Sequence, residues 1–254
     1  MKKAIINRGT ILQSDFDSGR LTPLCVVIHK FPSTGEFLGT ILQDDRSIGN
    51  FSLSVTKDST DKQVNIDLST LPISEPRQPG SQPEAQFSVQ PGGNVLFYVT
   101  RASGGNAVVV HPSGMPAQVV FDSRTLDKGD IFLVTLLRPG QYQLTNTRNK
   151  VQSQVKVAYP VQAAAPLTRL TVQTTNAGQK QFGSKSMELE GIQGLAVRCD
   201  VPSRLQMQIT ETFDQPPVVK GTGAAAAEKA PGAPAARPGK VTWRKPPTGN
   251  QENG

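Results

Sequence analysis

Cysteine, histidine and tryptophan are scarce in this chain, and hydrophobic residues are few. The 254 residues include 2 Cys, 2 His and 1 Trp, and the hydrophobic fraction is 36%. Two cysteines do not make a disulfide framework and are typical of a reducing compartment. We therefore expect Cys25 and Cys199 to be small, buried hydrophobic residues. Two histidines rarely make a metal site by themselves, so the sequence predicts no metal and no other cofactor.

Long apolar runs are also missing. The chain begins MKKAIINRGT, in which the apolar run has three residues, whereas a secretory signal needs roughly 7 to 15. No stretch approaches the ~20 apolar residues of a membrane-spanning helix. We expect no signal peptide and no membrane span, and hence a cytoplasmic protein or a component of a particle that assembles in the cytosol.

The sequence lacks the motifs of the common enzyme classes. It contains no G-x-S-x-G elbow, no H-E-x-x-H pair, no P-loop and no G-x-G-x-x-G, so hydrolase, zinc-protease and nucleotide-binding chemistry have no support. Asp44 and Asp45 are adjacent acids in a polar turn. Cys25 and His29 would lie about 13 Å apart on a strand, too far for the histidine to activate the thiol. We predict that the protein is not an enzyme.

Alternating and near-continuous apolar segments are what the sequence does contain. Residues 95–100 and 131–136 are almost wholly apolar, which is typical of strands that are packed on both faces or lie at a sheet centre. Residues 51–55 and 64–68 alternate strictly, the pattern of a sheet with one wet face. Turn residues such as Asp127-Lys128-Gly129 separate the runs. The fold class predicted is all-β.

Composition divides the chain into five segments. Residues 71–86 are a proline-rich linker, and residues 215–254 are an Ala, Pro and Gly tract that we expect to be disordered. The remaining segments are β-rich and cover residues 1–70, 87–159 and 167–213. Either the first and last of these complete one sandwich around the middle one, or the chain is a string of small β units that share faces. No internal repeat is convincing.

The middle segment carries a family resemblance. Residues 139–142 read Pro-Gly-Gln-Tyr, and residues 119–121 read Val-Val-Phe. In this order they are similar to the turn and the apolar run that flank the copper site of cupredoxins, so residues 87–159 resemble a cupredoxin-like Greek-key sandwich. The resemblance implies copper ligands at three positions, where this chain has other residues: Ala117, Asn146 and Asn149. The soft trigonal copper site therefore cannot form.

Two further features could carry function. His111 and Met115 lie close together in a loop and could present an imidazole and a thioether, so a metal-binding or redox carrier is an alternative. The only tryptophan lies in a basic, proline-flanked stretch of the C-terminal segment, where an exposed ring can dock in a partner or stack on a base. The residues predicted to bind a partner there are Lys240, Trp243, Arg244 and Lys245.

The net charge of +7 is concentrated at this end of the chain. Residues 217–254 contain six Lys or Arg against two Glu. The remainder carries too small an excess to require a polyanion, so association with nucleic acid through the C-terminal segment is an alternative only. The function predicted is a structural or adaptor protein that contacts other proteins, or further copies of itself, through sandwich faces and a basic tail.

Overall fold

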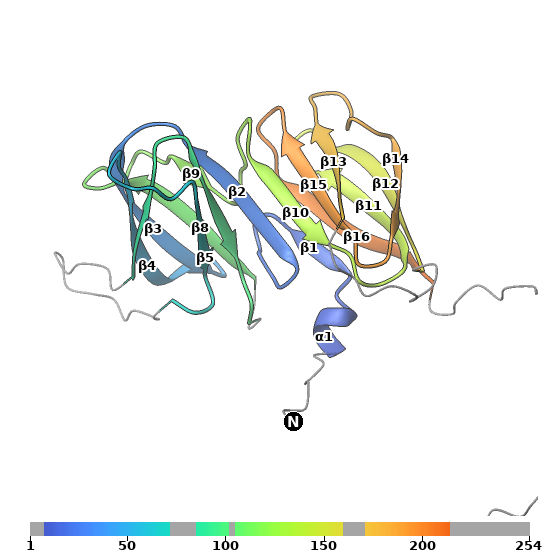
Figure 1. The fold of residues 1–254 in the computed structure, drawn as a ribbon. Coiled ribbons are helices and arrows are strands. Elements are labelled where there is room, and N and C mark those ends of the chain that lie inside the picture. Colours follow the sequence, from blue (N-terminus) through green and yellow to red (C-terminus); the bar gives the residue numbers. More distant parts are fainter. Residues whose placement is uncertain (1–7, 72–84, 102–104, 160–170, 214–254) are drawn as a thin grey trace, which may run out of the picture. The chain divides into compact units, whose positions relative to one another are not determined.

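The computed structural model describes residues 8–71, 85–101, 105–159 and 171–213. Within these residues it contains sixteen strands and one single-turn helix, α1 (Arg8–Ile11), as Figure 1 shows. The prediction of an all-β protein is confirmed. The predicted disordered segment, 215–254, and nearly all of the predicted linker lie outside the described residues.

A six-stranded sheet, here called the central sheet, runs through the whole described core. Its strand order is β13-β15-β10-β2-β7-β5. The strands are β2 (Cys25–Phe31), β5 (Gln63–Asp67), β7 (Gly93–Tyr98), β10 (Ile131–Thr135), β13 (Val172–Ala177) and β15 (Gly194–Cys199). Their apolar residues alternate in burial, so every second side chain enters the core.

Two five-stranded outer sheets complete the fold. The first has the order β6-β4-β3-β8-β9 and the second β1-β16-β11-β12-β14. The strands of the first are β3 (Gly35–Gln43), β4 (Arg46–Val55), β6 (Ala85–Val89), β8 (Asn106–Pro112) and β9 (Phe121–Asp122). Those of the second are β1 (Asp15–Asp17), β11 (Gly140–Asn146), β12 (Val151–Ala158), β14 (Ser186–Glu190) and β16 (Leu205–Thr212).

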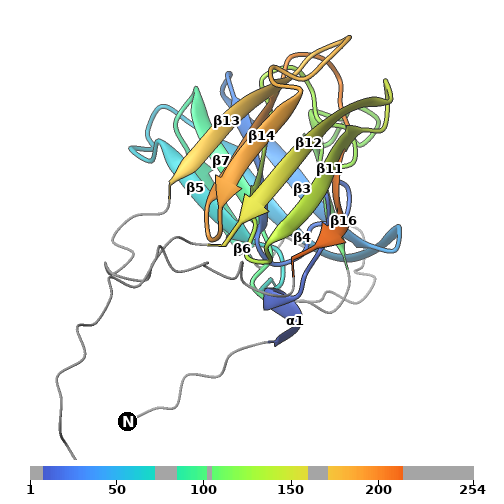
Figure 2. The ribbon, with the colours of Figure 1, turned by 90° about the vertical axis from the view of Figure 1, so that its right-hand side faces the viewer.

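Each outer sheet packs against one half of the central sheet. In the first half, the rings of Phe51 on β4 and Phe121 on β9 lie 6.0 and 5.2 Å from the ring of Phe97 on β7. In the second half, the side-chain amide of Gln173 on β13 donates to the carbonyl oxygen of Glu188 on β14 (2.9 Å), and Figure 2 shows β13 and β14 side by side. The result is two sandwiches with one continuous hydrophobic core.

The strand pairings reveal an internal duplication. The strands β1–β8 form one repeat and β9–β16 a second, and the two make the same contacts. The antiparallel pairs β2–β7, β3–β4 and β3–β8 correspond to β10–β15, β11–β12 and β11–β16. The parallel pairs β4–β6 and β5–β7 correspond to β12–β14 and β13–β15. The first strand of each repeat is exchanged, because β1 pairs with β16 and β9 with β8.

An approximate twofold axis relates the repeats. The equivalent strands β2 and β10 pair with each other in antiparallel fashion, with Val27 opposite Phe132. Val26 lies opposite Leu133 and Ile28 opposite Ile131, so the register is the same in both directions from the central pair. Both Val27 and Phe132 are fully buried. The junction between the repeats is therefore part of the core and not a flexible connection.

This arrangement corrects three expectations. The predicted Greek-key sandwich over 87–159 is wrong as a self-contained unit, because its strands are distributed over all three sheets and pair there with strands from outside the segment. Segments 1–70 and 167–213 do not form one sandwich of their own, since most of the first segment pairs with β7 and β8. The expectation of no internal repeat is also wrong.

The turn with the Pro-Gly-x-Tyr sequence has a clear structural role. It opens β11, and the buried Tyr142 donates its hydroxyl hydrogen to the carbonyl oxygen of Arg138 (2.8 Å). This is the geometry of a tyrosine corner, in which a phenol ties a sandwich edge to the preceding backbone. Burial raises the pKa of Tyr142 to about 12, so the hydroxyl remains a donor throughout the neutral range.

The repeats keep the same backbone with different residues. Gly92 precedes β7 with a φ of 80°, and at the equivalent place before β15 stands Ile192 with a φ of 74°. Conversely, Leu24 precedes β2 with a φ of 72°, and at the equivalent place before β10 the residue is Gly129, with a φ of 99°. A side chain in this left-handed region costs about 1 kcal/mol or more. The sheets on both sides therefore impose these turns against local preference.

Candidate functional site

Two equivalent loops meet where the repeats join. The tripeptide Phe-Asp-Ser occurs at 16–18 and again at 121–123, in each case followed by a buried leucine; residues 16–21 and 121–126 are called the FDS loops. The serine of each is fully buried. The Oγ of Ser18 accepts the backbone N–H of Leu205 (3.2 Å), and that of Ser123 accepts the N–H of Val108 (3.0 Å). Each serine thus anchors its exchanged strand to the other repeat.

The aspartates of the FDS loops hold arginines. Asp17 accepts hydrogen bonds from the Arg204 guanidinium (2.9 Å to Oδ2), from the side-chain amide of Gln206 (2.8 Å) and from the N–H of Gly19 (2.7 Å). Asp122 binds Arg124 in a two-pronged pair with N–O distances of 3.0 and 2.8 Å. The hydrogen bonds to Asp122 and Asp17 raise the pKa of Arg124 and Arg204, respectively.

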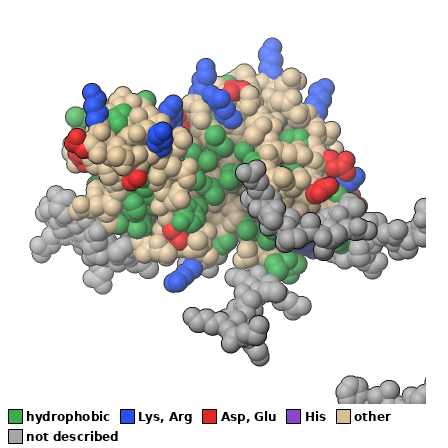
Figure 3. Space-filling view, viewed as in Figure 1, with side chains coloured by type: hydrophobic (Ala, Val, Ile, Leu, Met, Phe, Trp, Pro, Cys, Tyr) green, Lys and Arg blue, Asp and Glu red, His purple; other side chains and the backbone are tan. Residues whose placement is uncertain are grey.

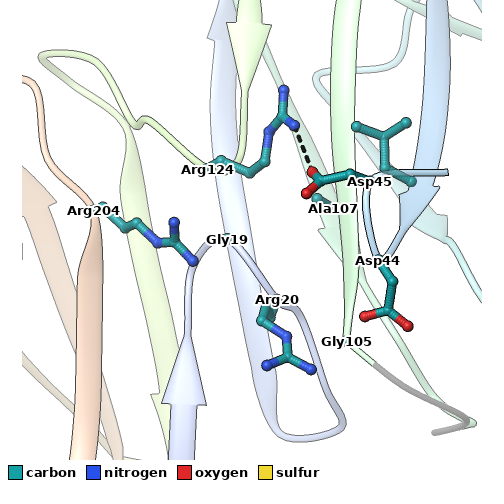
Figure 4. Close-up of a pocket in the computed structure, with 9 residues that line it drawn as sticks. Gly19, Arg20, Asp44, Asp45, Gly105, Ala107, Arg124 and Arg204 are labelled. Carbon is teal, nitrogen blue, oxygen red and sulfur yellow. Dashed lines mark hydrogen bonds and ion pairs between the residues drawn. The ribbon is translucent and has the colours of Figure 1, made fainter. Parts of the chain in front are cut away.

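A polar cavity of about 340 Å³ lies between the two FDS loops. Figure 4 shows that Gly19 and Arg124, which occupy equivalent positions in the two loops, both face it, as does the pair Ala107 and Arg204. A Cβ atom at position 19 would lie 3.2 Å from the Cα of Arg124, a tight contact that glycine avoids. Seven of the nine residues that line the cavity belong to the first repeat, so it lies mainly on that repeat's side of the contact between the loops.

The chemistry of this cavity is that of a structural junction. Arg124 also reaches Asp45 (3.0 Å), while Arg204 is held by Asp17. These guanidinium groups are thus largely committed to carboxylates, and the acids of the region balance the bases, which gives an anion little to bind. No cysteine, serine or histidine is among the residues that line it.

The outer face of the central sheet is apolar across its middle. The paired residues on this side form two rungs that run across all six strands, here called the ladder face. The first rung contains Thr174, Ala196, Leu133, Val26, Tyr98 and Asp67. Its four middle members are apolar or aromatic and only half-buried, while Thr174 is exposed.

The second rung has the same character. It contains Asn176, Arg198, Ile131, Ile28, Leu96 and Asn65. Its three apolar members are half-buried, and its polar members are exposed. Figure 3 shows hydrophobic side chains gathered over the middle of this face. An apolar centre with a polar rim is the composition of a protein–protein interface.

Charge is confined to the rim of the ladder face. Arg198 lies on β15 and Asp67 on β5, in opposite halves of the sheet. Burial opposes ionisation of Asp67, but hydrogen bonds from Ser69 and Thr100 lower its pKa below the ordinary value. At neutral pH the two rungs therefore carry one positive and one negative group on opposite sides of the apolar centre, and the exposed Lys30 follows Ile28 on the same side of β2.

The two cysteines are buried, as the sequence predicts. Cys25 donates its thiol hydrogen to the carbonyl oxygen of Thr22 (3.0 Å). Burial raises the pKa of the Cys25 thiol to about 11 and that of Cys199 to about 12. Neither forms a disulfide in the structure.

These thiols are expected to be inert in the folded protein. The raised pKa values leave fewer than about one thiolate in a thousand at pH 8, and burial excludes the reagent. Native protein should react with a thiol-specific disulfide reagent at least about 100 times more slowly than protein unfolded in guanidinium. Absorbance at a series of pH values measures both rates. Rapid modification of either cysteine in native protein at pH 8 would contradict the assignment.

Cys25 and His29 are not brought together. Instead, Nδ1 of His29 lies 2.7 Å from Oδ1 of Asp130, and its ring packs against Phe31 and Phe121 with centroids 4.7 and 4.8 Å away. The Asp130 carboxylate also accepts the N–H of Asp127 (2.8 Å). The pair links β2 to the turn before β10, so its role in the described structure is to join the repeats.

The alternative ligands His111 and Met115 gain no support. His111 is the last residue but one of β8, with Nδ1 3.2 Å from the carbonyl oxygen of Pro112, and Met115 is 59% exposed in the next loop. In the described part of the chain, no group of three or more His, Cys, Asp or Glu is placed to hold a metal ion. Of the cupredoxin ligand positions, the buried Asn146 donates to Ser203 (2.9 Å) and Asn149 to Gly178 (3.0 Å), while Ala117 lies in a loop.

The predicted partner-binding residues of the C-terminal segment lie outside the described residues. These are Lys240, Trp243, Arg244 and Lys245. Two features were missed at the sequence level, the FDS loops and the ladder face. The repeated Phe-Asp-Ser with its leucine was a usable signal for the first. For the ladder face, residues 95–100 and 131–136 showed that the strands are apolar on both sides, but the sequence did not show which side would be left uncovered.

Comparisons with protein-family models, curated proteins and solved structures found no match. Within the described ranges, no helix has the length and apolar character needed to span a membrane.

Proposed function

We propose that this protein is a non-enzymatic structural or adaptor component that contacts other proteins through the ladder face, with its basic C-terminal segment as a further contact. The observation that carries the proposal is the apolar centre of the central sheet's outer face. Val26, Ile28 and Ile131 lie at the centre of this face, where they are half-exposed and surrounded by a polar rim. Patches of this kind on soluble proteins mark interaction sites.

The remaining geometry supports a contact role. Two arginines that line the cavity between the FDS loops, Arg124 and Arg204, form ion pairs with Asp122 and Asp17. The buried thiols are shielded, and His29 is engaged with Asp130. These groups stabilise the junction of the two repeats and give a rigid sheet, and a rigid preorganised face loses little conformational entropy on binding.

The proposal is tested on the protein in its native setting. The full chain and an Ile28→Glu variant are isolated from the cells that produce them and analysed by size exclusion with light scattering. The wild type should elute in a particle whose mass exceeds the 27.2 kDa of one chain, and the variant should elute separately from that particle. A Val119→Glu variant, which changes an exposed loop residue outside the ladder face, should stay in the particle. A wild type that is always recovered as a single chain would contradict the proposal.

A further inference from the structure

The central strands have apolar side chains on both faces, but one chain buries only one of these faces. Residues 95–100 and 131–136 have the near-continuous apolar pattern of strands covered on both faces. In the structure, their inner members Phe97, Phe132 and Val134 are fully buried, whereas the outer members Leu96 and Leu133 are only half-buried. Among the described residues, only the inner face is covered by an outer sheet. A second layer would complete the pattern.

We propose that a second copy of this chain covers the ladder face, so that two central sheets pack face to face in a twofold-symmetric dimer. This inference rests on the proposed function and names the partner. Apolar sheet faces pack at about 10 Å with their strands nearly aligned, and the apolar middle of the ladder face offers two copies such a contact. Interfaces related by a twofold axis use the same patch on both subunits.

The rim charges favour this partner and set its orientation. A twofold axis parallel to the strands and midway between β2 and β10 places β15 of each copy over β7 of the other. Arg198 of one copy then lies opposite Leu96 of the second copy, one rung from Tyr98 and Asp67, which its long side chain can approach, and this arrangement occurs twice. A guanidinium next to a carboxylate and an aromatic ring is favourable on both counts. An axis perpendicular to the strands would leave Arg198 over Ala196.

The size of the face predicts a moderate affinity. Six strands at about 4.8 Å each cover about 29 Å, and the two rungs with one flanking outward residue per strand, at about 6.8 Å each, cover about 20 Å, which gives roughly 500 to 600 Å² per copy. The total of roughly 1,000 to 1,200 Å² is at the lower end for specific complexes. We therefore expect a dissociation constant of about 1 to 10 µM.

Sedimentation of the purified full-length chain tests the inference. Between about 1 and 200 µM, a range that brackets the expected constant, the wild type should pass from monomer to dimer. Ile28→Glu places a charge at the centre of the interface and should raise the dissociation constant at least about 100-fold. Leu133→Glu, at the equivalent position of the second repeat, should do the same. Arg198→Glu puts like charges at the rim and should raise it about 10-fold.

Controls separate docking from folding. Val119→Glu should dimerise like the wild type, and all variants should keep the wild-type far-UV circular dichroism and unfolding midpoint, because the changed side chains point away from the core. A dimer that survives both Ile28→Glu and Leu133→Glu would overturn the inference. A wild type that stays monomeric at every concentration would also overturn it. In that case the proposed function would still be supported if the Ile28→Glu variant is absent from the particle that contains the wild type.

The sole tryptophan of the chain, Trp243, reports the other candidate occupant. Its emission should be the same in monomeric wild type and Ile28→Glu. A monomeric wild type whose emission is blue-shifted, and shifts to the red in Ile28→Glu, would show that the chain's own C-terminal segment covers the ladder face. That outcome would also overturn the second-copy pairing.

Discussion

Replacing Phe132 by alanine is expected to remove about 3 to 5 kcal/mol of unfolding free energy. Phe132 is fully buried and pairs with Val27 on the approximate twofold axis. Loss of the ring leaves a cavity between two repeats whose sheets are continuous, so the surroundings cannot collapse to fill it. Since domains of this kind are stable by only about 5 to 15 kcal/mol, the variant should be markedly destabilised.

Urea unfolding followed by circular dichroism and tyrosine fluorescence measures this effect. Tyr98 lies in the first repeat and Tyr142 in the second, so the fluorescence reports on both repeats. Circular dichroism and fluorescence should change together in one transition because the repeats share a core. Val27→Ala removes fewer atoms at the equivalent position and should cost about 2 kcal/mol. Thr135→Ala, on the outer side of β10, should stay within about 0.5 kcal/mol of wild type. A loss below about 1 kcal/mol for Phe132→Ala would be inconsistent with this packing.

The second large effect is expected from Asp17→Ala. The carboxylate is nearly buried and accepts hydrogen bonds from Arg204, Gln206 and the N–H of Gly19. Its removal leaves these donors without their partner and frees the loop that anchors β1. We expect a loss of about 2 to 3 kcal/mol, moderated because the Arg204 side chain is 36% exposed and water can solvate it.

The duplication supplies matched controls for this prediction. Asp122→Ala should also lower the free energy of unfolding, but by less than Asp17→Ala, because the Asp122 side chain is 21% exposed and that of Asp17 is 11% exposed. Asp45 is 84% exposed, and Asp45→Ala should change the unfolding free energy by no more than about 0.5 kcal/mol. Thermal unfolding of the three variants measures the order. If Asp45→Ala were as costly as Asp17→Ala, the ion pairs of the FDS loops would not be the source of the effect.

Strand positions could be predicted from the sequence where alternation was strong. The expected strands at 64–68 and 131–136 match β5 and β10 to within a residue at each end, and the one at 51–55 ends where β4 ends. The position of β13 could not be predicted in this way, because Gln173, Thr174 and Thr175 give this edge strand no apolar alternation. The same absence of pattern makes such strands hard to recognise in any chain.

The pairing of strands could not be predicted, and neither could the duplication. Equivalent positions such as Phe97 and Val197, or Gly92 and Ile192, share a register but not a residue type, so only Phe-Asp-Ser remains as a visible trace. Pairing between β1 and β16 joins the two ends of the described core. The cavity of the FDS loops depends on this long-range pairing, so no local motif could locate it.

The exchange of first strands has a consequence for synthesis on the ribosome. The first repeat can complete its outer sheet as soon as β9 emerges, since β9 directly follows β8. The second repeat needs β1, which has left the ribosome long before β16 is made. Closing so long a loop is slow because chain entropy opposes it. The last event of folding should therefore be the return of the oldest strand to the newest one, and until then the nascent chain exposes an open edge.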